Sequence, residues 1–120
     1  MFTLWKTFRF EAAHQLANHD GKCARLHGHS WIFRLFVKGE YLQLSGPQEN
    51  MLTDYFAIGM VGKAQAEMLD HRNLNDLFET NMPTSEYLAR RIFETNAPLL
   101  AGLFAVEVEE TCTSGCRYEP

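Results

Sequence analysis

The chain has little of what would place it at a membrane or on a nucleic acid. None of its apolar runs approaches the roughly 20 residues that a membrane-spanning helix needs. Its first residues lack the charged region, the apolar stretch and the cleavage site of a signal peptide. The net charge is -4, and no basic run is longer than the pair Arg90 and Arg91. We therefore predict a cytoplasmic protein without a broad cationic surface for nucleic acid, although a few cations would suffice for a phosphorylated small molecule.

Cysteine is also scarce, and the 3 cysteines are Cys23, Cys112 and Cys116. An odd number of thiols in a cytoplasmic chain argues against a disulfide framework, so we expect free thiols. Cys112 and Cys116 are one residue further apart than the thiols of a usual zinc knuckle, and we expect no second metal site there. The chain has no internal repeat, linker or glycine-rich nucleotide-binding loop. Its 120 residues predict one domain, 1–120.

Regular hydrophobic patterning predicts the fold. The strands are expected at residues 2–13, about 29–39, 104–111 and around 117–118. The helices are expected at residues 54–69, with Asp54 as N-cap, and from the N-cap Thr84 to about 96. This order predicts an α+β fold, in which one antiparallel four-stranded sheet carries two helices on one face. The exposed outer edges of such a sheet favour pairing between copies.

The first expected strand and the first expected helix differ in how regular their patterns are. One face of the strand is expected to carry Phe2, Leu4, Phe8, Phe10 and Ala12. The inner side of the helix is expected to carry Ile58, Val61, Gln65 and Met68. Gly59 and Gly62 weaken the helix prediction, because each costs about 1 kcal/mol relative to alanine in a helix interior.

Three of the 5 histidines, His14, His27 and His29, predict a metal site. His27 and His29 are two residues apart on an extended segment, so their side chains point to the same face, and Gly28 keeps the other face free of bulk. His14 ends the first strand-like run, and a hairpin-like return would bring it alongside. Three neutral imidazoles with one open position are typical of catalytic zinc, whereas Cys23 as a fourth ligand would make a closed structural site.

Cys23, Asp70 and His71 are candidates for proton transfer. Cys23 lies in a loop near Arg25, and positive charge favours the thiolate that acts as base or nucleophile; the alternative is an inert buried thiol. His71 titrates near physiological pH and follows Asp70 at the end of the expected helix, where both side chains can be aimed into a cleft. The alternative is a solvated histidine that the helix dipole stabilises.

Glu110 is a candidate for ligand binding and ends an acidic row with Glu107 and Glu109. Such rows are usually solvated strand ends. A buried carboxylate could instead accept two N–H donors from an aminopyrimidinone ring in a paired contact. The spacing alone leaves both interpretations open.

Five segments resemble the 6-pyruvoyltetrahydropterin synthase family, and they occur in the family's order. They are FEAAH at 10–14, CARLHGHS at 23–30, LDHRNLN at 69–75, PTSE at 83–86 and ETCTSGC at 110–116. The similarity runs nearly from end to end. The compact spacing between Cys23 and His27, together with the tail that carries two cysteines, is similar to the family's bacterial queuosine-pathway branch.

The resemblance implies a tunnelling fold, in which subunits join their sheets into a barrel. The usual assembly is a hexamer of two trimers, with active sites at subunit interfaces. The implied site residues are His14, His27 and His29 for zinc, Cys23, Asp70 and His71 for proton transfer, and Glu110, Thr84 and Ser85 for the pterin.

The reaction that the resemblance implies is a zinc-dependent lyase reaction on 7,8-dihydroneopterin triphosphate. Its products are 6-carboxytetrahydropterin, acetaldehyde and triphosphate, and the implied role of zinc is to hold the substrate's two side-chain hydroxyls. Lys22, Arg25 and Lys63 are candidates for binding the triphosphate. Two alternatives stay open: a pyruvoyl-type synthase that only eliminates triphosphate, and a non-catalytic, zinc-stabilised pterin-binding module.

Overall fold

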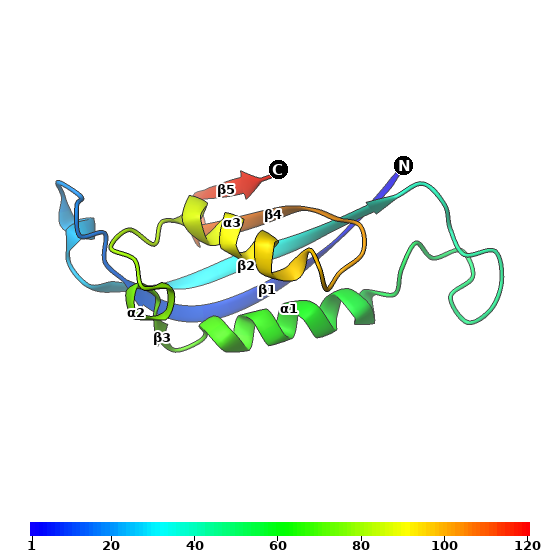
Figure 1. Ribbon diagram of the computed structural model, residues 1–120, viewed down its shortest axis with the longest axis horizontal. Helices are drawn as coiled ribbons and strands as arrows, with labels where there is room; N and C mark the ends of the chain where they lie inside the picture. The colour runs from blue at the N-terminus through cyan, green and yellow to red at the C-terminus, as the bar shows by residue number, and fades with distance from the viewer.

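A computed structural model describes residues 1–120 as one mixed sheet with helices packed against it (Figure 1). The strands are β1 (Phe2–His14), β2 (His27–Gly39), β3 (Arg72–Asn73), β4 (Leu103–Thr111) and β5 (Ser114–Tyr118). The helices are α1 (Tyr55–Leu69), α2 (Leu74–Phe78) and α3 (Ser85–Asn96), with a single 3-10 turn, η1 (Lys22–Ala24). The strand order across the sheet is β3-β1-β2-β4-β5.

The α+β fold expected from the sequence is confirmed, and the structure adds two short elements to it. The four-stranded antiparallel sheet gains β3, which pairs parallel with the end of β1 through Ala12 and Arg72. The segment between the two expected helices also contains α2, whose N-cap Asn73 accepts a hydrogen bond from the backbone N–H of Asn75. A two-residue strand and a single short helix are too brief to show a hydrophobic period, so the pattern could not reveal them.

The hairpin of β1 and β2 is antiparallel along its whole length and positions the histidines. Phe10 pairs with Trp31, and their rings stack with centroids 5.8 Å apart and planes 1° from parallel. The pairing ends with His14 opposite His27. β2 therefore begins two residues earlier than expected, because its pairing with β1 continues to the end of the hairpin.

The helices α1 and α3 cover the same face of the sheet, as expected. The core between them combines Phe33 and Leu35 of β2 with Ile58 of α1 and Ile92 of α3. No helix covers the opposite face, where Trp5 is 56% exposed (Figure 1). None of the helices combines the length and the apolar character needed to cross a membrane.

The contact between α1 and β1 explains the glycines of that helix. A Cβ at Gly62 would overlap the ring of Phe8, so glycine permits the close approach of helix and strand. The expected inner side of α1 is partly wrong, because Met68 is 47% exposed and Leu69 is fully buried. Because Gly62 packs directly against the sheet, the buried side of α1 contains both glycines and ends at Leu69.

Candidate metal centre

His14, His27 and His29 converge at the end of the β1–β2 hairpin, on the face of the sheet that carries the core. The ring centroids are 4.6 Å apart for His14 and His27, 5.2 Å for His14 and His29, and 4.8 Å for His27 and His29. His14 is fully buried, and the other two rings are half-buried. The convergence follows from the register, in which His14 pairs with His27 and His29 lies one step further along the same face of β2.

Backbone carbonyls orient two of the three rings. Nδ1 of His14 lies 2.9 Å from the carbonyl oxygen of Pro83, and Nδ1 of His27 lies 2.6 Å from that of Arg25. A carbonyl oxygen only accepts, so each Nδ1 carries the proton and donates it. Both rings are therefore left with a lone pair on Nε2, as is usual for histidines that bind a metal.

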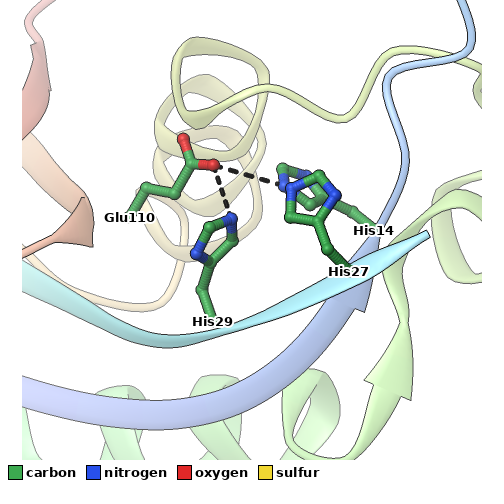
Figure 2. Close-up of side chains that lie close together, drawn as sticks. All are labelled: His14, His27, His29 and Glu110. Atoms are coloured by element: carbon green, nitrogen blue, oxygen red, sulfur yellow. Dashed lines mark ion pairs between the residues drawn. The ribbon is translucent and has the colours of Figure 1, made fainter. Parts of the chain in front are cut away.

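Glu110 approaches the histidines from β4 (Figure 2). Its Oε1 lies 2.7 Å from Nε2 of His29 and 3.4 Å from Nε2 of His14. Each of the four residues offers one ligand atom, and these atoms all lie within 4.8 Å of one another. The sequence predicted the three histidines as one group, but it did not predict that Glu110 would join them.

The shape of β4 determines where Glu110 points. Val106 and Val108 lie in the core, and the two-residue period of a strand puts Glu110 on the same face. The pairing with β5 is irregular between Glu109 and Thr111, so Glu110 has no partner on that strand. The acidic row is thus divided: Glu109 faces the other side, where Oε1 accepts a hydrogen bond from Arg34 over 3.0 Å.

The centre holds buried nitrogen atoms that suit a cation. Nε2 of His14 and Nε2 of His29 are buried without a hydrogen-bond partner, a state that costs about 1–3 kcal/mol for each atom. Burial lowers the pKa of His29; the Glu110 carboxylate acts in the opposite direction, and the other two imidazoles add to the lowering. His29 is therefore neutral near pH 7, as a metal ligand must be. Three neutral imidazoles and a carboxylate oxygen fit a divalent metal such as zinc.

The residues predicted for proton transfer lie in two different places. Cys23 is a half-buried free thiol in η1, and Cys112 and Cys116 are also free, as expected. Asp70 and His71 lie at the outer edge of the sheet, between α1 and β3. The sequence predicted no separation of this kind between the thiol and the histidine.

Asp70 is held at that edge by two hydrogen bonds. Its Oδ1 accepts the backbone N–H of Glu11 over 2.8 Å, and its Oδ2 lies 2.8 Å from Nδ1 of His71. The Glu11 N–H and then the His71 side chain lower the pKa of Asp70, so the carboxylate is ionised. It therefore accepts the Nδ1 proton of His71 and leaves Nε2 of that exposed ring free to exchange a proton.

A cavity of about 550 Å³ lies beside this edge of the sheet. His71 and His29 both line it, together with Glu11, Gly28 and Ser30. Cys23 is not among the residues that line it. One chain thus brings His71 and His29 to one cavity but leaves the thiol outside it.

Thr84 and Ser85 lie at the start of α3, next to the residue that orients His14. Oγ1 of Thr84 accepts the backbone N–H of Tyr87 over 3.1 Å, which confirms the expected N-cap. Ser85 donates from Oγ to Glu86 over 2.7 Å. The carbonyl of the preceding Pro83 binds His14, a role that the sequence pattern did not reveal.

A further polar contact fixes the chain just after His14. The side-chain amide of Asn75 accepts from the backbone N–H of Gln15 over 2.9 Å and donates to its carbonyl over 2.7 Å. The short helix α2 therefore holds the end of β1 in place.

Comparisons with known proteins agree with this architecture. A family model described as 6-pyruvoyl tetrahydropterin synthase matches residues 3–120. A relative from Synechocystis sp., 6-carboxy-5,6,7,8-tetrahydropterin synthase, is 43% identical over 123 aligned positions, which cover 98% of this chain and 93% of the relative. The protein of the same name from Haemophilus influenzae is 32% identical, with 99% of each chain covered.

Solved structures show the same fold. The structure of Caenorhabditis elegans 6-pyruvoyl tetrahydropterin synthase matches with a TM-score of 0.83 and 27% sequence identity. The match covers 99% of this chain and 95% of that one. With a family model and relatives that both extend over nearly all of its length, the chain belongs to the 6-pyruvoyl tetrahydropterin synthase family.

Proposed function

We propose that this protein is a zinc-dependent lyase of queuosine biosynthesis. It converts 7,8-dihydroneopterin triphosphate into 6-carboxytetrahydropterin, acetaldehyde and triphosphate. The observation that carries the proposal is the convergence of three imidazoles at the end of the β1–β2 hairpin. The relatives from Synechocystis sp. and Haemophilus influenzae support the choice of product, because both are named for the carboxylated pterin.

His14, His27 and His29 would hold the zinc ion. When bound, zinc supplies Lewis-acid polarisation of a substrate oxygen and stabilises the negative charge that develops there. The carbonyls of Pro83 and Arg25 orient two of the ligands, so the chain supplies both the ligands and their supports.

Cys23, His71 and Asp70 carry the proton transfers in this proposal. The Cys23 thiolate takes or returns a proton bound to carbon, and His71 exchanges the partner proton through Nε2. Asp70 orients the ring by accepting from Nδ1. Glu110 accepts N–H donors of the pterin ring, and Thr84 and Ser85 lie beside the ring.

The proposed assembly is a cytoplasmic hexamer of two trimers, which completes the active site between subunits. The sheet has open edges at β3 and β5, and the face opposite the helices is uncovered (Figure 1). His71 is 81% exposed at one of these edges, and Cys23 lies outside the cavity that His71 lines. These observations favour a site to which neighbouring subunits both contribute.

A product assay tests the proposed reaction. We expect zinc-loaded protein, incubated without oxygen with 7,8-dihydroneopterin triphosphate, to form 6-carboxytetrahydropterin and acetaldehyde, both detected by mass spectrometry. A 6-pyruvoyl product without acetaldehyde would instead assign the activity of the Caenorhabditis elegans protein, the second candidate that the structural match favours. Pterin binding with no turnover would indicate a non-catalytic module.

The variant Cys23→Ala tests the role of the thiol. We expect it to keep its zinc and its assembly and to lose turnover about 10²- to 10⁴-fold, the range of general acid–base catalysis. Cys112→Ser is the matched control, because this exposed thiol lies in the β4–β5 turn. Loss of zinc from Cys23→Ala would instead make the thiol a fourth ligand of a structural site.

A further inference from the structure

We infer that Glu110 has two alternating partners: without a pterin its carboxylate completes the coordination of the metal, and pterin binding withdraws it. This inference rests on the proposed function, since it uses the proposed metal and the proposed pterin contact of the same residue. It adds a resting-state ligand to the three histidines and makes opening of the metal position a consequence of substrate binding.

The lone pairs of the centre require something positive between them. Nδ1 of His14 donates to Pro83, so its buried Nε2 bears a lone pair. That nitrogen lies 3.4 Å from Oε1 of Glu110, an atom that also carries lone pairs. Two such atoms repel each other at this distance, and a metal ion bound by both of them would remove the repulsion.

Hydrogen bonding to His29 does not account for the position of the carboxylate. Oε1 of Glu110 lies 2.7 Å from Nε2 of His29, yet this nitrogen has no hydrogen-bond partner, so the two atoms are close without hydrogen-bond alignment. A cation bound by both Oε1 of Glu110 and Nε2 of His29 explains why these atoms are close although they are not aligned for a hydrogen bond. Ligand atoms of a tetrahedral zinc site lie about 3.3 Å apart, given zinc–nitrogen distances of about 2.0–2.1 Å. The separation from His14 matches this value, and that from His29 needs to widen by about 0.6 Å.

The two partners of Glu110 exclude each other. A paired contact with an aminopyrimidinone ring uses both carboxylate oxygens, so Oε1 is then no longer available to the metal. The backbone permits the change, because Glu110 has no pairing partner on β5 and its side chain is 29% exposed. The metal position therefore opens to the substrate's hydroxyls only when a pterin ring is seated.

Metal affinity tests the resting-state contact directly. We expect Glu110→Gln to bind zinc at least about 10-fold more weakly than the wild type in competition with a chromophoric chelator. Glu109→Gln is the matched control, since it removes the same charge from the opposite face of β4 and should leave zinc affinity unchanged. Glu110→Asp, which keeps a shorter carboxylate, is the second variant if Glu110→Gln does not fold, and we expect intermediate affinity.

The visible spectrum of the cobalt-substituted protein tests the exchange. We expect the ligand-field bands of wild-type protein to change when pterin, which lacks the side-chain hydroxyls, is added, and no such change in Glu110→Gln. Pterin fluorescence reports binding separately. Unchanged zinc affinity in Glu110→Gln, or an unchanged wild-type spectrum with pterin bound, would overturn the inference while leaving the proposed function intact. Failure of the wild type to bind metal or pterin would overturn the proposed function itself.

Discussion

Asp70 illustrates at the scale of one residue how the fold and the candidate site share a side chain. One carboxylate oxygen accepts the backbone N–H of Glu11 on β1, and the other contacts His71. The first contact belongs to the sheet edge and the second to the proposed proton transfer. A substitution of Asp70 would therefore remove both contacts at once. Substituting His71 removes only the second contact and leaves the hydrogen bond from Glu11 in place.

The pKa of Asp70 offers that separation. We expect carbon-detected NMR titration to give a value below the ordinary 3.8, because the Glu11 N–H and then His71 stabilise the ionised form. Since the folded pKa is the lower one, Asp70 contributes stability above pH 3.8 that is lost as the pH falls through the folded value.

The variant His71→Gly is the appropriate comparison, because His71 has a φ of 58° and glycine accepts this left-handed conformation. We expect the pKa of Asp70 to rise in this variant yet to stay below 3.8, since the Glu11 contact remains. A value at or above 3.8 would show that His71 alone ionises the carboxyl.

Metal removal should be visible in stability as well as in activity. A ligand at 100 times its dissociation constant stabilises the native state by about 2.7 kcal/mol when the unfolded chain does not bind it. We expect zinc at that excess to raise the free energy of unfolding by about this amount, measured by urea denaturation, and a chelator to reverse it. The same measurement on His14→Ala with His27→Ala should show no effect of zinc; stabilisation that persists would place the metal elsewhere.

At the scale of elements, α1 shows why a residue that weakens an isolated helix can be required in a folded protein. Gly62 lies where the helix meets the ring of Phe8, whereas a Cβ at Gly59 would meet the end of the Lys6 side chain, with Nζ nearest at 2.9 Å. A ring in the core cannot move aside, and the end of a lysine side chain can. Helix propensity predicts the same effect for both glycines, whereas their packing predicts that only Gly62 is required.

This difference predicts opposite effects for two alanine substitutions. We expect Gly62→Ala to lower the free energy of unfolding by about 1–3 kcal/mol, because overpacking outweighs the gain in helix propensity. We expect Gly59→Ala to raise it by up to about 1 kcal/mol. Urea denaturation of both variants gives the comparison, and equal effects would contradict the assigned contact with Phe8.

The cap of α3 can be separated from the proposed pterin contact. We expect Thr84→Ala to lose about 1 kcal/mol of stability, because the hydrogen bond to the N–H of Tyr87 is lost. Thr84→Ser keeps the hydroxyl and should keep that stability. If Thr84→Ser is as stable as the wild type but has lower turnover, the methyl group of Thr84 contacts the substrate. If urea denaturation shows that Thr84→Ala is also as stable as the wild type, the cap does not contribute to stability.

The whole molecule presents a sheet face that one chain leaves open. Charged side chains cover part of it: Nη1 of Arg34 lies 3.0 Å from Glu109, and Nη1 of Arg117 lies 3.0 Å from Glu107. Trp5 and the exposed His71 lie on the uncovered face and at the sheet edge. In the proposed barrel of subunits these surfaces meet neighbouring chains.

Mixing two inactive variants tests whether a site needs two chains. The variants Cys23→Ala and His71→Asn are mixed in equal amounts, dissociated and reassembled. We expect about a quarter of the sites in the random mixture to regain activity, because each of the two contributing chains is the required variant about half of the time. The recovery arises where an intact thiol meets an intact histidine from another subunit. Light scattering should show the same assembly for each variant alone. Mixed assemblies without recovery would place both residues of a site in one chain.

The sequence by itself determined the features that depend on neighbours along the chain. Alternation along the first strand placed Phe8 and Phe10 in the core, the cap at Thr84 located the start of α3, and the spacing of His27 and His29 put both on one face. Strand and helix periods are local geometry, so such patterns can be read without the fold.

Only the tertiary structure decided which distant residues meet. The hairpin register brought His14 to His27, the irregular end of β4 brought Glu110 to His29, and the carbonyl of Pro83 reached His14. Two-residue β3 and the need for glycine at Gly62 also depend on what lies across the sheet. These contacts are set by strand pairing and by burial, which act between segments that the chain order keeps far apart.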